Sequence, residues 1–313
     1  MPNDAFDHDV LVMGAGIAGL AAATACAAAG LRTAVAGTGL FGGLVLNVND
    51  LVEPPRPDQA SGADYAATLF GEAMEAGAEP IDGPVATLWR DGAGFAARPE
   101  EEPGRVLRAR AVICATGASP RPLPVPGAGA FAHRGIAHCA DCDGPLHRGR
   151  PVVVVGGGDA ALQGALTLAA WASEVHVLLR GAAPRARAEF VARAAAEPRI
   201  RLHRNAEILR LLGEDGLEAV EVREGAGAPL RIAARAVFPW IGLMPNTAAL
   251  PAEVTRDADG AVVVDAALRT SLPGLFAAGA VRAGHGGRLR HALHDGEGAA
   301  RGVIAMLTTG AAA

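Results

Sequence analysis

The sequence contains no lysine, because all 28 of its cationic side chains are arginine. This absence excludes mechanisms that need a lysine Schiff base or the lysine of a phosphate-binding P-loop. Aromatic residues make up only 4% of the chain, which argues against a stacking platform for single-stranded nucleic acid. The formal net charge of −5 offers no basic field for nucleic acid or anionic lipid, so neither partner is expected.

Other features of the composition bound the fold. Four cysteines are too few for a disulfide scaffold, and 313 residues predict about two domains. The N-terminus carries aspartates without a basic segment, which is unlike a secretory signal. Residues 10–31 carry no charge and could span a membrane, but four glycines interrupt them, so a strand, a turn and a helix are expected instead. We predict a soluble, cytoplasmic protein.

A glycine-rich turn follows a short apolar run near the N-terminus. Residues 9–13 predict a buried parallel strand, and G-A-G-I-A-G from Gly14 to Gly19 precedes an alanine-rich helix. Gly14 permits the tight turn, Gly16 lets a pyrophosphate approach the backbone, and Gly19 lets the helix pack on the strand. The helix N-terminus offers N–H groups to the anion. The motif predicts dinucleotide binding, with a purely structural turn as the alternative.

The same pattern recurs at Gly156, 142 positions after Gly14. An apolar run at residues 151–155 leads into G-G-G-D-A-A, and residues 174–179 read as the next strand. Two such turns predict two dinucleotide-binding domains, and hence electron transfer between two dinucleotides. The remaining chain fits this plan: apolar strands ending in small residues are expected at residues 111–117, 236–242 and 275–279, a small antiparallel sheet at 80–110, and a semi-rigid, proline-rich crossing between domains at 120–126.

The sharpest motif is C-A-D-C-D-G, which runs from Cys139 to Gly144. A C-x-x-C pair can close a compact disulfide, and its thiols cycle readily when a neighbour tunes their pKa. Asp143 adjoins Cys142 and could accept or donate a proton. The flanking carboxylates disfavour a thiolate, so we expect an offsetting group such as an oxidised flavin against the sulfur.

Two other interpretations of the pair remain open. One is half of a zinc site completed by a nearby histidine, and the other is an idle pair. Zinc generally needs a second pair of ligands at a recognisable spacing, whereas Cys26 and Cys114 are isolated and predicted to be buried. The histidines near the pair are His133, His138 and His147. Redox chemistry is the favoured interpretation.

The motifs together resemble those of the low-molecular-weight thioredoxin reductases, almost from end to end. Besides the glycine turns and the cysteine motif, the chain shares Gly42-Gly43, A-T-G at residues 115–117, P-N-T at 245–247 and T-S-L-P-G-L-F-A-A-G at 270–279. Each motif alone is loose, and their shared order makes the resemblance specific.

The resemblance implies an α/β fold with two Rossmann-like, three-layer ββα domains. An FAD domain, residues 1–116 and 243–313, would be split by an inserted NAD(P)H domain, residues 117–242, that carries the cysteines. It also implies a homodimer whose domains swivel, so that the nicotinamide and the cysteines reach the flavin in turn. Electrons would pass from NADPH through FAD to Cys139–Cys142, and then to thioredoxin or a similar small redox protein.

The resemblance also assigns roles by position. Cys142 would face the flavin as the charge-transfer thiolate, Cys139 would be the interchange thiol that attacks the partner disulfide, and Asp143 would be the acid/base. The implied FAD contacts are Gly14, Gly16, Gly19, Gly37, Thr38, Gly42, Gly43, Leu44, Val85, Ala115, Thr116, Gly117, Gly279, Ala280, Arg290 and His291. The implied NADPH contacts are Gly156, Gly158, Asp159, Ala161, Arg180 and Arg185.

The chain departs from the family pattern at several positions of the expected FAD site. Ala280 stands where the family has an aspartate that binds FAD, and an unpaired buried partner there would cost about 1–3 kcal/mol. Leu44 and His291 each replace a glutamine, and the last helix is expected to be shortened around residues 296–298. His285, His291 and His294 line either a flavin-edge pocket or, as we favour, the surface.

The arginine cluster for the 2′-phosphate is also reduced, to Arg180 and Arg185. No acidic residue ends the preceding strand, so NADPH is favoured over NADH. A donor other than a nicotinamide, and a plain surface loop at these arginines, remain alternatives.

Three functional hypotheses follow. The first is the NADPH-dependent flavoprotein disulfide reductase. The second is a flavoprotein of the same fold that oxidises a small-molecule dithiol with oxygen, or takes electrons from a different donor. Dithiol oxidases of this kind usually have histidine after the second cysteine, so Asp143 favours the reductase. The third is a silent binding protein that has lost FAD, which Ala280 motivates and the intact cysteine motif opposes.

Overall fold

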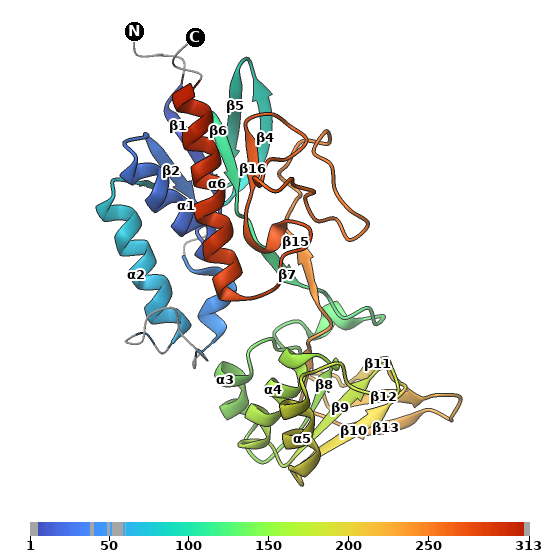
Figure 1. Ribbon diagram of the computed structural model, residues 1–313. Helices are drawn as coiled ribbons and strands as arrows, with labels where there is room; N and C mark the ends of the chain where they lie inside the picture. The colour runs from blue at the N-terminus through green and yellow to red at the C-terminus, as the bar shows by residue number, and fades with distance from the viewer. Residues whose placement is uncertain (1–5, 38–40, 49–50, 52–58, 60, 310–313) are drawn as a thin grey trace. The chain divides into compact units, whose positions relative to one another are not determined.

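The computed structural model describes residues 6–37, 41–48, 51, 59 and 61–309. The chain forms two compact units (Figure 1): unit 1 comprises residues 1–119 and 244–313, and unit 2 comprises residues 120–243. Strands β7 (Ala118–Pro120) and β15 (Leu243–Pro245) pair with each other where the chain crosses between the units. Unit 1 is thus discontinuous in sequence, and the chain crosses between the units after residues 119 and 243.

Unit 1 is built on a seven-stranded sheet with the order β3-β2-β1-β6-β5-β4, in which β16 also pairs with β6. Strands β1, β2, β3, β6 and β16 are joined in parallel, whereas β4, β5 and β6 are antiparallel neighbours. The antiparallel strands expected at residues 80–110 therefore extend the main sheet instead of forming a separate one. The strands are β1 (His8–Met13), β2 (Thr33–Ala36), β3 (Glu79–Ile81), β4 (Val85–Asp91), β5 (Gly94–Pro99), β6 (Leu107–Cys114) and β16 (Leu275–Ala277).

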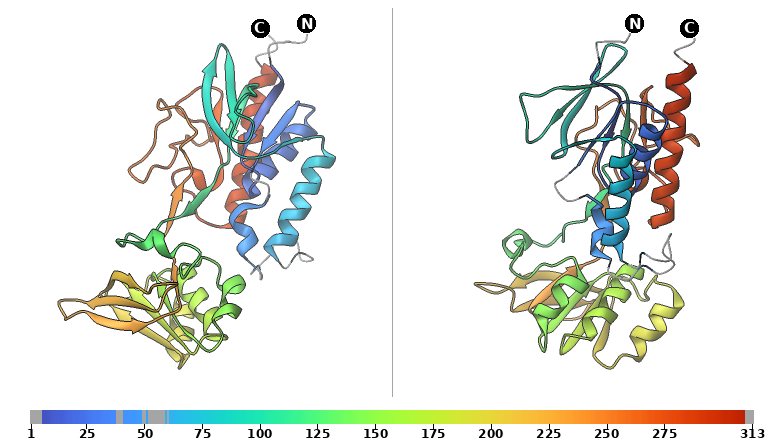
Figure 2. Two further views of the ribbon diagram at one scale, coloured as in Figure 1. Left: turned by 180° about the vertical axis from the view of Figure 1, so that it is seen from behind. Right: turned by 90° about the vertical axis from the view of Figure 1, so that its left-hand side faces the viewer.

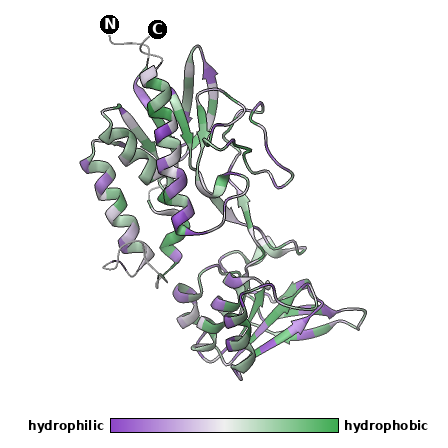
Figure 3. Cartoon of the chain, in the orientation of Figure 1, coloured by the Kyte–Doolittle hydropathy of each residue, from purple (hydrophilic) through white to green (hydrophobic). Residues whose placement is uncertain are grey.

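Helices α1 (Ile17–Ala28), α2 (Gly62–Glu75) and α6 (Leu289–Thr309) pack on one face of this sheet (Figure 2). Side chains alternate between the faces of a strand, so Val10 and Val12 pack under the helices while Leu11 and Met13 pack on the opposite face. Both faces are buried, which explains the continuous apolar run of β1 (Figure 3). Short 3-10 helices η1 (Gly43–Asn47) and η4 (Gly279–Val281) complete this unit.

Helix α6 corrects one expectation. It runs without a break for 21 residues, so the glycines at residues 296–298 do not shorten it. They mark close packing instead, because a Cβ at Gly296 would lie 2.2 Å from the carbonyl oxygen of Ala18 in α1. A Cβ at Gly302 would lie 2.5 Å from the ring of Phe276. Small residues on α6 let it approach α1 and the sheet closely.

Unit 2 has three layers. A parallel sheet of order β10-β9-β8-β14 has helices α3, α4 and α5 on one face and an antiparallel sheet, β11-β12-β13, on the other. This arrangement confirms the predicted ββα fold. The elements are η2 (Ala128–Phe131), α3 (Ala140–Asp143), η3 (Gly144–His147), β8 (Pro151–Val155), α4 (Asp159–Ala169), β9 (Glu174–Leu179), α5 (Ala188–Ala196), β10 (Ile200–Arg204), β11 (Ala206–Leu212), β12 (Ala219–Glu224), β13 (Leu230–Ala233) and β14 (Ala236–Pro239).

The structure assigns two segments that the sequence could place in more than one way, residues 10–31 and residues 120–126. The uncharged residues 10–31 fold as β1, a turn and α1, followed by the start of the link to β2. Within the described ranges, no helix is both long and apolar enough to cross a membrane. The proline-rich residues 120–126 belong to unit 2, because Leu123 and Val125 are buried in the core between its two sheets.

Candidate functional site

The first glycine turn joins β1 to α1 and leaves no room for a side chain at Gly14 or Gly19. Gly14 has φ +107°, and a Cβ there would lie 2.4 Å from the carbonyl oxygen of Ala115. A Cβ at Gly19 would lie 1.8 Å from the carbonyl oxygen of Gly14. Only hydrogen fits at either position. These two glycines therefore serve the turn and the packing of the helix, as their places in the motif predict.

Gly16 is open by contrast. A Cβ there would have its nearest neighbour, the carbonyl oxygen of Gly42, 3.8 Å away. Gly16 is also the N-cap of α1, and no side chain caps this helix end. Uncapped N–H groups beside free space form a cradle for a phosphate anion. The geometry thus fits the pyrophosphate of a dinucleotide.

Several predicted contacts gather around this turn. Gly42 forms a parallel bridge with Gly16, its N–H donates to the Ala15 carbonyl at 2.7 Å, and Gly43 lies beside Gly16. A Cβ at Gly37 would lie 2.6 Å from the Ala15 side chain. The remaining members of this set are Leu44, which is 40% exposed in η1, Val85, which is buried in the core on the face opposite α1, and Thr38, which lies outside the described residues.

The A-T-G motif is held by a residue that we did not single out from the sequence. Asn246 donates its side-chain N–H to the carbonyl of Thr116 at 2.9 Å, and its backbone carbonyl accepts from the Thr116 hydroxyl at 2.7 Å. The Asn246 backbone N–H also donates to the carbonyl of Gly117 at 3.0 Å. Asn246 belongs to the P-N-T motif, which was a signal for it, but the contact spans 130 residues of sequence. The two motifs form one structural element.

A buried charge network lies after β16. The carboxylate of Asp295 accepts from the Gly279 N–H at 3.1 Å and from Arg282 at 2.7 and 2.8 Å, and it contacts Nδ1 of His285 at 3.2 Å. Asp295 is 3% exposed. Burial alone would raise its pKa, but the hydrogen bonds from His285 and Arg282 outweigh burial and lower the pKa to about 2. His285 is therefore not a surface histidine, contrary to expectation.

This network predicts a pH effect on stability. A pKa lowered to about 2 stabilises the folded chain above the pKa of an unfolded aspartate, and this contribution is lost as the pH falls toward 2. From pH 5 to pH 3 we expect the contribution of Asp295 to fall by about 1 kcal/mol. Urea unfolding at both pH values, on the wild type and Asp295→Asn, measures this fall. A free-energy difference between the two proteins that is equal at both pH values would contradict it.

Three other predicted residues lie on α6 and are exposed, whereas Ala280 precedes that helix. His291 is exposed, and its ring lies edge-on to that of His285, with 6.1 Å between the centroids. Arg290 and His294 are exposed as well. Ala280, in η4, is half-buried and directly follows Gly279.

The second glycine turn lies in unit 2 and, like the first, has one crowded glycine and one open glycine. A Cβ at Gly156 would lie 2.3 Å from the carbonyl oxygen of Trp240, whereas one at Gly158 would meet nothing within 4 Å. Gly158 is the uncapped N-cap of α4, and Ala161 is fully buried where the helix packs on its sheet. Asp159 instead binds the backbone N–H and side chain of Arg187, at 2.7 and 2.9 Å. This turn also fits a pyrophosphate.

Arginines gather at the carboxyl end of the parallel strands of unit 2. Arg180 follows β9 directly, and the N–H of Arg185 donates to the Gly157 carbonyl at 2.6 Å, which ties its loop to the glycine turn. Arg204 ends β10, pairs in register with Leu179 and donates to the Ala182 carbonyl at 3.2 Å. All three side chains are exposed. Strand register brings Arg204 to this edge, so local sequence gave no signal for it.

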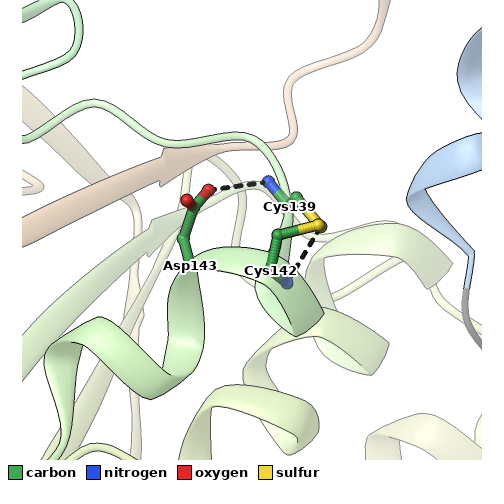
Figure 4. The surroundings of a disulfide bond; sticks show 3 residues. All are labelled: Cys139, Cys142 and Asp143. Carbon is green, nitrogen blue, oxygen red and sulfur yellow. Dashed lines mark hydrogen bonds between the residues drawn. A yellow bond between two sulfur atoms is a disulfide. The ribbon is translucent and has the colours of Figure 1, made fainter.

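The cysteine pair forms a disulfide between Cys139 and Cys142, in the first turn of α3 (Figure 4). The N–H of Cys142 donates to Sγ of Cys139 at 3.0 Å, and the Asp143 carboxylate accepts from the N–H of Cys139 at 3.4 Å. Cys139 is buried and Cys142 is exposed. Asp143 is thus hydrogen-bonded to the backbone within the cysteine motif.

The other two cysteines are not part of this disulfide. Cys26 and Cys114 are free and buried, and burial raises the pKa of both thiols, that of Cys26 to about 12. Burial also lowers the pKa of His147, although the Asp143 carboxylate opposes this. In the described part of the chain, no group of three or more histidine, cysteine or acidic side chains is placed to hold a metal.

Two glycine turns that fit dinucleotides and a disulfide in a Rossmann-like unit define a two-nucleotide redox protein. The pyridine nucleotide-disulphide oxidoreductase family matches residues 8–296, and the chain belongs to this family. It is a thioredoxin-reductase-like member, in a class that uses FAD and NADPH.

Individual relatives agree with this placement. The chain is 34% identical over 305 residues to the thioredoxin reductase of Treponema pallidum, covering 97% of this chain and 98% of that one. It is 36% identical to the NADH dehydrogenase of Bacillus subtilis, over 87% of this chain and 53% of that one. Among solved structures it resembles the thioredoxin reductase of Lactococcus lactis, with TM-score 0.91, 26% identity and coverage of 97% and 100%.

Proposed function

We propose that the protein carries electrons from NADPH through FAD to the Cys139–Cys142 disulfide, and then to the disulfide of thioredoxin or a similar small redox protein. One observation carries the proposal: a disulfide in a C-x-x-C-D motif lies in the same chain as two open, uncapped glycine turns. Unit 1 binds FAD at the Gly16 turn, and unit 2 binds NADPH at the Gly158 turn. FAD supplies a two-electron carrier between the nicotinamide and the disulfide.

Cys139, Cys142 and Asp143 have separate roles in the transfer to the partner disulfide. Two electrons and two protons convert Cys139–Cys142 to a dithiol. The Cys139 thiolate attacks one sulfur of the partner disulfide and forms a mixed disulfide. Cys142 next attacks Sγ of Cys139, which releases the partner as a dithiol and restores the internal disulfide. Asp143 accepts and returns the protons of these thiols.

The dithiol oxidase alternative is not favoured. Asp143, hydrogen-bonded to the backbone of Cys139, occupies the position where such oxidases usually carry histidine. The silent-protein alternative is opposed by the intact disulfide and by a first turn that still fits a pyrophosphate.

Flavin content and donor use test the proposal. Purified protein should be yellow, its flavin should bleach on anaerobic addition of NADPH, and thioredoxin should be reduced catalytically. Bleaching by dithiols but by neither nicotinamide would favour the oxidase. A colourless protein that takes up no added FAD would contradict the proposal altogether.

We infer that Arg180, Arg185 and Arg204 together recognise the 2′-phosphate of NADPH. None of them has an ion pair with a carboxylate among the described residues, so their charges are available to an anion. Losing one charge-assisted hydrogen bond, at about 1.5–3 kcal/mol, corresponds to at least about a tenfold change in affinity.

Substitution of Arg204 tests this group. Arg204→Ala should raise the Kd of NADPH about tenfold and leave that of NADH unchanged, because NADH lacks the 2′-phosphate. Fluorescence titration of each nucleotide measures both constants. Arg223→Ala is a control, because this exposed arginine pairs with Glu207 on the antiparallel sheet. Equal weakening of NADPH and NADH by Arg204→Ala would refute the assignment.

We further propose that the protein is a homodimer, as the resemblance implies, and that it works in the cytoplasm. Sedimentation of the purified flavoprotein tests the assembly. A single boundary at the mass of one 31.5 kDa chain would contradict a dimer.

A further inference from the structure

The Asp295 network lies directly beside the first glycine turn. A Cβ at Gly279 would lie 2.9 Å from Cβ of Ala18, and a Cβ at Gly296 would lie 2.2 Å from the carbonyl oxygen of the same Ala18. Ala18 is in the first turn of α1, two residues after Gly16. The hydrogen bond from Gly279 to Asp295 therefore connects two segments that both abut the phosphate-binding end of α1.

All the partners of Asp295 in this network come from one short segment. Gly279, Arg282 and His285 lie within seven residues, and each contacts the same carboxylate. Gly279 has φ +76° and is buried, so its N–H needs a hydrogen-bond acceptor within the protein, which Asp295 provides. One side chain of α6 thus fixes the conformation of the turn that follows β16.

Charge balance lets this carboxylate lie near an anion site. Arg282 binds both oxygens of Asp295, and the side chains of the pair are 18% and 4% exposed. His285 lies on the same carboxylate with its side chain 8% exposed. The guanidinium offsets the negative charge, so the network does not repel a pyrophosphate at Gly16.

We propose that Asp295 is a positioning residue for FAD. It holds the segment from Gly279 to His285 against the first turn of α1, and so fixes the wall of the FAD site at Gly279 and Ala280. Position 280 carries no carboxylate of its own, and Asp295 supplies one to the same turn from α6. This inference rests on the proposed FAD site in unit 1.

Titration of the flavin-free protein with FAD, followed by flavin fluorescence, tests the role of Asp295. Asp295→Asn should raise the Kd of FAD about tenfold or more, because the turn loses a charged hydrogen-bond acceptor. Adding Ala280→Asp should restore the Kd to within about threefold of the wild type, because the new carboxylate adjoins Gly279. Arg282→Met offers a second variant that disrupts the same network, and it should also weaken FAD binding.

A matched control separates positioning from general damage. Asp265 accepts from Arg269 and from two backbone N–H groups, but its side chain is 43% exposed. Asp265→Asn should leave the Kd of FAD unchanged. Circular dichroism of each flavin-free variant should match the wild type.

The outcomes distinguish the two levels of the argument. If the wild type binds FAD and Asp295→Asn binds it equally well, the positioning role is overturned and the proposed function stands. If Asp295→Asn weakens binding but Ala280→Asp does not restore it, Asp295 only supports the fold, and the inference is again overturned. If the wild type binds no FAD, both the inference and the proposed function fail.

Discussion

Replacing Cys139 with serine should abolish reduction of the partner disulfide while leaving reduction of the flavin by NADPH intact. The variant has no internal disulfide to receive electrons and no interchange thiol to attack the partner. We expect turnover with thioredoxin to fall by more than about 1,000-fold, as for removal of other essential nucleophiles. Anaerobic flavin bleaching by NADPH should proceed at a rate close to that of the wild type.

Cys142→Ser is the matched variant, and it separates the two sulfurs. It should also lose turnover, but its remaining Cys139 thiol should trap the partner as a stable mixed disulfide. Cys139→Ser should trap much less. Cys142 is exposed whereas Cys139 is buried. Trapping of the partner through Cys142 instead of Cys139 would reverse the assigned roles. Loss of flavin reduction in either variant would contradict the division between the two half-reactions.

Valine at Gly16 should remove FAD binding without unfolding unit 1. The backbone of Gly16 is extended, with φ −78° and ψ −178°, a conformation that valine adopts readily. Its methyl groups would occupy the space proposed for the pyrophosphate. Losing two backbone hydrogen bonds to a charged group, at about 1.5–3 kcal/mol each, corresponds to a loss of affinity of about 100-fold or more.

Gly158→Val provides the reciprocal control. The backbone of Gly158 is also extended, with φ −90° and ψ −178°, and a Cβ there would meet nothing within 4 Å. Gly158→Val should remove NADPH binding and retain FAD, whereas Gly16→Val should do the reverse. Flavin fluorescence and nucleotide titration measure both affinities in each variant. If each substitution removed the other nucleotide, the assignment of cofactors to the units would be wrong.

Local patterns were enough to predict the buried parallel strands and the two glycine turns, whereas the ββα architecture was implied by the resemblance. Apolar runs such as residues 151–155 are buried on both faces of a sheet, so hydrophobicity alone marks them as strands. Each glycine turn directly follows its strand. The Cβ that Gly19 lacks would clash with Gly14 of the same motif, and the one that Gly14 lacks would clash with Ala115, which is hydrogen-bonded to the end of β1. Short-range constraints of this kind leave a clear signal in sequence.

Long-range contacts decided the features that the sequence did not predict. Arg204 reaches the arginine group through the register between β10 and β9, and Asn246 holds Thr116 across 130 residues. The continuity of α6 depends on its packing against α1, which overrides the low helix propensity of its glycines. Asp295 carried no signal in the sequence, because only the fold places Gly279 and Arg282 around it.

The most direct test of the central claim is to label free thiols after anaerobic reduction with NADPH and to locate the labels by mass spectrometry. We predict that the FAD-loaded protein gains labels at Cys139 and Cys142, and that the flavin-free protein gains neither. Cys26 and Cys114 serve as internal references, because these buried free thiols should label equally after denaturation whether or not NADPH was added. A protein whose flavin is reduced by NADPH while Cys139 and Cys142 remain disulfide-bonded would contradict the account.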